Sequence, residues 1–109
     1  MTTLIEKLLE VQQELSHAKA EAVNPHFKSS YVKFEDLWDY AKEALNSKGI
    51  LIQQLSHECE VGACIETVLY GHGDSLSTGK MIVRAEKPTA QAFGSAVTYA
   101  KRYSLSMAL

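Results

Sequence analysis

The sequence predicts an α+β fold with two N-terminal helices, a three-stranded antiparallel meander and a C-terminal helix packed on the sheet. Apolar residues recur with a helical period in two segments before residue 49 and in one segment after residue 88. Three short apolar runs lie between them, separated by gaps of hairpin length. The length of 109 residues suits one core, so we assign residues 1–109 to a single domain.

The first helix is indicated by apolar residues at alternating spacings of four and three. The members of this stripe are Leu4, Leu8, Val11, Leu15, Ala18 and Ala22. Thr3 and Glu6 form a predicted capping box at its start. We expect Asn24-Pro25 to break the helix, because the residue before a proline avoids helical angles. The stripe suits either the core or a contact with another subunit, and the pattern does not distinguish the two.

A second helix is predicted over residues 34–48. Its apolar face comprises Phe34, Leu37, Trp38, Ala41 and Leu45. On such a face we expect Trp38 to lie in the core rather than to serve as a base-stacking platform. Gly49 is the expected left-handed residue that ends the helix.

Three strands are predicted over residues 50–56, 61–70 and 76–85. The sequence Gly71-His72-Gly73-Asp74 indicates a turn between the second and the third, and Gly79 suggests a β-bulge. A last helix then starts at Pro88 and Thr89. Its expected apolar face comprises Phe93, Ala96, Val97, Ala100, Tyr103 and Met107.

No pattern in the sequence indicates catalysis, a metal or a cofactor. His57, Cys59, Cys64 and His72 are close in sequence, but Cys64 falls within a predicted strand, whereas zinc ligands are usually paired on tight turns. Neither cysteine falls at a predicted helix N-terminus, where the pKa of a thiol drops. Two cysteines, no signal-peptide pattern and no apolar run of about 18 residues are typical of an intracellular chain outside the membrane.

The net charge of −2 argues, by itself, against a nucleic-acid partner. The charge is uneven, however: residues 23–34 carry only Lys28 and Lys33, and residues 80–109 carry five bases against Glu86, which gives local charges of +2 and +4. The aromatic residues in these segments include Phe27, Tyr31, Tyr99 and Tyr103. Basic grooves with aromatic platforms bind single strands. A solvated charged surface is the alternative, and the pattern alone does not decide between them.

Two blocks of sequence carry most of the functional information. The first is Asn24-Pro25-His26-Phe27-Lys28-Ser29-Ser30-Tyr31. The second, in the predicted last helix, is Gly94-Ser95-Ala96-Val97-Thr98-Tyr99-Ala100-Lys101-Arg102-Tyr103-Ser104-Leu105. In this order and at this separation, the blocks resemble the signature of the essential recombination function (Erf) family of phage single-strand annealing proteins. Together with the residues that separate them, they span most of the chain.

The resemblance implies a non-enzymatic protein of phage homologous recombination and DNA repair that needs neither ATP nor a metal. Such proteins bind single-stranded DNA, anneal complementary strands and form rings or filaments around a β-β-β-α core. The implied partners are single-stranded DNA, further copies of the chain, and a host or phage single-strand-binding protein or exonuclease, in the cytoplasm of a bacterial host. Residues 1–109 would be the DNA-annealing core without the family's usual C-terminal extension.

The matching positions and the basic segments together predict the binding residues. The expected DNA-binding residues are Lys28, Tyr31, Lys33, Arg84, Tyr99, Lys101, Arg102 and Tyr103. Structural roles are expected for Asn24, Pro25, Phe27, Gly94 and Ser95, the last two by letting the helix approach the sheet. Tyr99 and Tyr103 also share a helix face with predicted core positions, so each suits either base stacking or the core.

Two other function classes fit parts of the pattern. A double-stranded RNA binding module has a compatible order of elements, but it typically opens its last helix with a lysine cluster, whereas residues 86–91 contain only Lys87. A structural oligomer that assembles through the N-terminal stripe and binds no nucleic acid is the other alternative.

Overall fold

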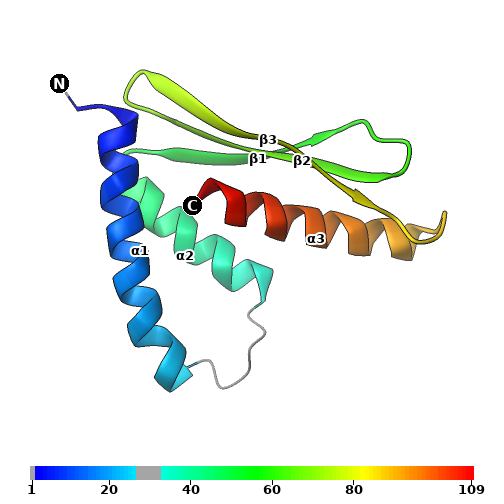
Figure 1. Cartoon of the computed structure of the whole chain (residues 1–109), viewed down its shortest axis with the longest axis horizontal. Helices are drawn as coiled ribbons and strands as arrows, with labels where there is room; N and C mark the ends of the chain where they lie inside the picture. The colour runs from blue at the N-terminus through cyan, green and yellow to red at the C-terminus, as the bar shows by residue number, and fades with distance from the viewer. Residues whose placement is uncertain (1, 27–32) are drawn as a thin grey trace. The chain divides into compact units, whose positions relative to one another are not determined.

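The computed structural model describes the backbone of residues 2–26 and 33–109 and the side chains of residues 2–15 and 33–109. The three strands form one sheet in the order β1-β2-β3, so the predicted antiparallel meander is confirmed. The helix that follows the sheet packs against it, as predicted (Figure 1). The elements are α1 (Leu4–His26), α2 (Phe34–Ser47), β1 (Leu51–His57), β2 (Gly62–Gly71), β3 (Asp74–Arg84) and α3 (Ala90–Ala108).

The chain divides into two compact units. The helical unit comprises Met1–Leu51 and Tyr70–Asp74, and therefore contains α1, α2 and the turn between β2 and β3. The sheet unit comprises Ile52–Leu69 and Ser75–Leu109, and contains most of the sheet together with α3.

In the helical unit, α1 begins with the predicted capping box. The Glu6 amide donates to Thr3 Oγ1 at 3.2 Å, and the Thr3 amide donates to Glu6 Oε2 at 3.4 Å. Leu4, Leu8 and Val11 are buried, and α1 packs against α2. This part of the predicted stripe therefore lies in the core.

The predicted break at Asn24-Pro25 is wrong, because α1 continues to His26. A proline biases the preceding residue away from helical angles without excluding them. The helix nevertheless ends one residue after Pro25, so the predicted boundary is displaced rather than absent.

The end of α2 follows the prediction for Gly49, whose φ is +76°. The Ile50 amide donates to the Leu45 carbonyl and the Gly49 amide to the Asn46 carbonyl, both at 3.0 Å. This pair of bonds is a Schellman motif, and it satisfies carbonyls that the helix end leaves without partners. Trp38 is partly buried beside Phe34, with ring centroids 6.1 Å apart.

The core of the sheet unit forms where α3 lies along β2. Ala96 and Ala100 of α3 pack with Ala63 and Ile65 of β2, and all four are buried. Val83, Ala85 and Val97 pack around this cluster. Because α3 contributes only alanines to this cluster, the helix backbone can lie close to the strand.

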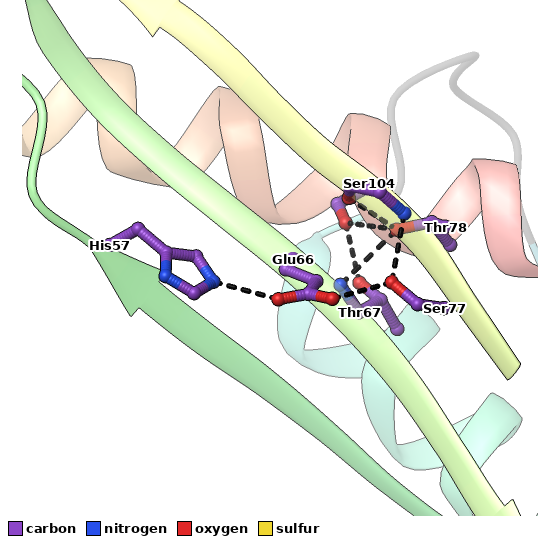
Figure 2. A network of polar contacts seen from close by, with 7 residues as sticks. His57, Glu66, Thr67, Ser77, Thr78 and Ser104 are labelled. Atoms are coloured by element: carbon purple, nitrogen blue, oxygen red, sulfur yellow. Dashed lines mark hydrogen bonds and ion pairs between the residues drawn. The ribbon is translucent and has the colours of Figure 1, made fainter. Parts of the chain in front are cut away.

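Hydroxyl groups extend this contact toward the C-terminus of α3. The fully buried Ser104 places its Oγ 2.6 Å from Thr67 Oγ1 (Figure 2). Gln54 Nε2 donates to Thr67 Oγ1 at 3.2 Å and to the Lys101 carbonyl at 2.9 Å. These contacts give hydrogen-bond partners to polar groups whose burial would otherwise destabilise the fold.

The other face of the sheet carries a second polar cluster. Glu66 lies between two residues that face α3, so its side chain projects from the opposite face. Its Oε1 lies 2.7 Å from His57 Nε2, and Ser77 Oγ donates to its Oε2 (Figure 2). The Ser77 hydroxyl and then the His57 ring hold the pKa of Glu66 below its ordinary value.

A bulge at Gly79 shifts the alternation of side chains along β3. Gly79 has φ +81°, and its amide donates to Ser77 Oγ at 2.9 Å. Thr78 contacts Ser104 of α3, and Val83 packs in the α3-facing core. On a regular strand, Thr78 and Val83 would point to opposite faces, because an even number of residues lies between them. One extra residue between them, as in a β-bulge, accounts for this.

As a result, Lys80, Ile82 and Arg84 share the sheet face that points away from α3.

We predict that Gly62→Ala destabilises the protein by about 1–3 kcal/mol, the typical cost of overpacking. A Cβ at Gly62 would overlap the Val83 carbonyl oxygen, so the backbone of β3 would have to move. Thermal or urea unfolding measures the effect. The matched control is Gly94→Ala, where a Cβ meets nothing within 4 Å and should stabilise the exposed helix by about 0.5–1 kcal/mol. Equal effects of the two substitutions would contradict this account.

We also predict that Glu66→Gln costs more stability at pH 7 than at pH 3. The pKa of Glu66 is lower in the folded protein than in the unfolded chain, where it is about 4.3, so its carboxylate stabilises the fold at pH values above about 4.3. This stabilisation is lost as the pH falls through the pKa of the folded protein. The unfolding midpoints of wild type and variant should therefore converge on acidification. Glu58→Gln, at an exposed position in the same unit, is the control. A Glu66→Gln difference that is independent of pH would refute the ion-dependent contribution.

Candidate nucleic-acid interface

Two tyrosines lie on the outside of α3. Tyr99 is 52% exposed and Tyr103 is 48% exposed, so the expectation that Tyr103 lies on the apolar core face is wrong. Their ring centroids are 6.1 Å apart at an interplanar angle of 22°, which is a stacked pair. The pair forms a continuous aromatic surface on the outside of the helix.

The same correction applies to two further residues of the expected core face. Phe93 is 49% exposed and Met107 is 69% exposed. The stripe of α3 that contacts the sheet is narrow, because its centre is formed by Ala96, Ala100 and Ser104, each four residues apart, with Val97 partly buried at its edge. Large side chains beside such a stripe extend past the edge of the contact and into solvent.

The basic pair of α3 is divided between two sides of the helix. Successive residues differ by about 100° around the helix axis, and residues three or four apart share a side. Arg102 therefore lies on the side of Tyr99, whereas Lys101 is two residues from each tyrosine and points elsewhere. Both basic residues are partly buried, and both make further contacts. Tyr99 and Tyr103 therefore stack on each other, and Arg102 lies beside Tyr99 on the helix surface by its spacing.

The other predicted binding residues are not part of this group. Arg84 is exposed on the sheet face that points away from α3. Lys33 is exposed and is the N-cap residue of α2, in the helical unit. Lys28, Tyr31 and Phe27 lie outside the described residues, as do the side chains of Asn24 and Pro25.

The predicted structural role of Gly94 and Ser95 is not supported. Both are exposed, and a Cβ on Gly94 would meet no described atom within 4 Å. The close approach of α3 to the sheet occurs instead at Ala96 and Ala100. Ala96 and Ala100 were both on the expected apolar face of the helix. That expectation nevertheless relied more on the large apolar residues of the face than on the small ones.

An open hollow of about 490 Å³ lies where α3 begins, and the sequence did not predict it. Its lining mixes apolar and charged residues, among them Glu60, Val61, Lys87 and Phe93. Thr89 caps the helix here, because its side chain accepts a bond from the Ala92 amide at 3.1 Å. Two acidic side chains, Glu60 and Glu86, outnumber Lys87 in the lining, so the hollow does not favour an anion.

The described residues contain no group of three or more His, Cys, Asp or Glu side chains that could hold a metal ion. None of the described helices is long and apolar enough to cross a membrane.

Comparison with known proteins identifies the family. No curated protein and no solved structure matches the chain. A family model described as the ERF superfamily matches residues 4–109, which is nearly the whole chain. This match confirms the resemblance seen in the two sequence blocks and indicates a role in recombination and strand annealing. The chain belongs to the ERF superfamily.

Proposed function

We propose that the protein binds single-stranded DNA and anneals complementary strands without ATP, acting as an oligomer in phage recombination. The observation that best supports this function is the exposed, stacked pair of Tyr99 and Tyr103 with Arg102 on the same side of α3. Its position within the sequence block that resembles the Erf signature adds support.

The chemistry of this group suits a single strand. Aromatic rings stack on any base, and each stacked base contributes about 1–3 kcal/mol. The Arg102 guanidinium would pair with a phosphate, which makes binding independent of sequence and sensitive to salt. Because the tyrosines already contact each other, less side-chain freedom is lost when a base stacks on them. A strand held in this way keeps base edges available for a complementary strand.

A single chain offers few such groups, so its affinity for DNA should be weak. Several copies along one strand would bind it more tightly, because each further contact becomes intramolecular. The roles of Lys28, Tyr31, Lys33, Arg84 and Lys101 in binding the strand stay predictions. A single-strand-binding protein or an exonuclease as a partner, and the host cytoplasm as the location, belong to the same proposal.

We predict that Tyr99→Ala and Tyr103→Ala each weaken binding of fluorescent oligo-dT by about 5- to 150-fold, the loss of one stacked base. Fluorescence anisotropy at fixed salt measures it. Met107→Ala, which removes an exposed side chain from the same helix, should leave binding unchanged. Tyrosine variants that bind as wild type would show that the pair is not the platform.

We predict different salt dependences for the two basic residues of α3. Arg102→Gln should lower the slope of log K against log salt by about 0.7, the value for one phosphate contact on a single strand. Lys101→Gln should lower it by less, because Lys101 points away from the tyrosines. Titrations at several salt concentrations measure both slopes. The reverse order of effects would place the strand on the other side of α3.

The annealing step is tested with complementary strands that carry a fluorophore and a quencher, without ATP or divalent ions. The proposal expects the protein to accelerate quenching, and the Tyr99→Ala variant to do so less. Tighter binding to duplex RNA than to oligo-dT would favour a double-stranded RNA module instead. Assembly without binding to either would favour a purely structural oligomer.

A further inference from the structure

The outer side of α1 carries an apolar pair that the helical core does not use. Ile5 is 62% exposed and Leu9 is 55% exposed. Residues four apart are neighbours on a helix surface, so the two form one patch. Leu4 and Leu8, the adjacent residues in sequence, are buried on the other side.

This patch has an acidic border. Glu6 and Glu10 each follow one of the two apolar residues and, being four apart, lie together along one flank of the patch. Glu6 is exposed, and Glu10 Oε2 forms an ion pair with Lys7 Nζ at 3.0 Å. We call Ile5, Glu6, Leu9 and Glu10 the α1 patch.

The sheet unit carries a patch of the opposite charge. Ile82 is 59% exposed on the sheet face that points away from α3. Lys80 and Arg84 precede and follow it by two residues, so all three share that face, and both cations are exposed. We call these three residues the β3 patch.

We propose that the α1 patch of one copy docks on the β3 patch of a second copy of this chain. Apolar side chains meet in the centre, while the Glu6 flank faces Lys80 and Arg84. Complementary charge of this kind favours the correct partner and its orientation. The inference deepens the oligomer part of the proposed function and does not depend on DNA binding. It offers Arg84 a carboxylate partner on a second copy as an alternative to the phosphate predicted for it.

Such a contact is head-to-tail, because the two patches are different surfaces. A docked pair leaves one patch of each kind unused, so assembly continues until a ring closes or a filament forms. Two helical turns against one strand bury less than the roughly 800 Å² per partner of a standard stable interface. A single contact is therefore weak, and assembly should depend on protein concentration.

Sedimentation velocity over a range of protein concentrations tests the contact. We expect the mass of the wild-type protein to rise with concentration. Ile82→Glu should raise the concentration needed for association at least tenfold, as should Ile5→Lys combined with Leu9→Lys. The matched control is Leu76→Glu, which adds the same charge to the same strand. Leu76 is 44% exposed and precedes the bulge, on the sheet face that carries α3, so this variant should assemble as wild type. Circular dichroism verifies that each variant is folded.

Mixing the two defective proteins gives the sharpest result. Each variant keeps the patch that the other has lost, so an equimolar mixture should associate again but stop at dimers. Wild-type mass that does not change with concentration would overturn the proposal, because the patches would then be unused or paired within one chain. Variants that assemble like the wild type, or a mixture that stays monomeric, would overturn it as well.

Binding of a short oligo-dT separates this inference from the proposed function. An oligonucleotide long enough for one chain only should bind Ile82→Glu as tightly as wild type, because Ile82 lies on the opposite side of the sheet from the tyrosines. If the wild type binds no oligonucleotide, the proposed function fails while the sedimentation result still decides the docking. If it binds but never assembles, only the docking fails.

Discussion

The contact between the small residues of α3 and the central strand determines much of what the sheet unit presents to solvent. Ala96, Ala100 and Ser104 form a narrow stripe that fits against β2, and a hydroxyl pair between Ser104 and Thr67 closes its end at 2.6 Å. Close packing of this kind leaves no space beside the strand for a ring. The tyrosines of the helix therefore lie at the surface because their smaller neighbours pack closely against the strand.

The same contact gives the sheet two different faces. One is covered by α3, and the other carries the cluster around Glu66 and the exposed side chains of β3. The proposed DNA platform and the proposed docking surface for a second copy lie on opposite sides of this layer. A protein that holds a strand and contacts its neighbours at the same time benefits from this separation, because neither partner has to displace the other.

Much of the fold was predictable because local rules decide it. The capping box at Thr3 and Glu6, the left-handed Gly49 and the bulge at Gly79 follow from the chemistry of a few adjacent residues. The end of α1 was misplaced because the rule for a residue before proline is a bias. The face of α3 was misjudged because periodicity identifies candidates for burial, whereas the neighbouring strand selects among them by size. Ser104 shows this most clearly, since this polar residue is buried, whereas Tyr103 and Met107, which hydrophobicity assigned to the core, are exposed.

The bulge at Gly79 has a consequence for how this hairpin can evolve. Side chains on a strand alternate, so a bulge acts as a phase shift for every residue that follows it. Straightening of the bulge with Gly79 still present would turn Val83 outward and would direct Lys80, Ile82 and Arg84 toward the helix. The hairpin can therefore accept many substitutions in its outward side chains, yet a substitution at Gly79 that removed the positive φ of the bulge would exchange the inside and the outside of the strand that follows it.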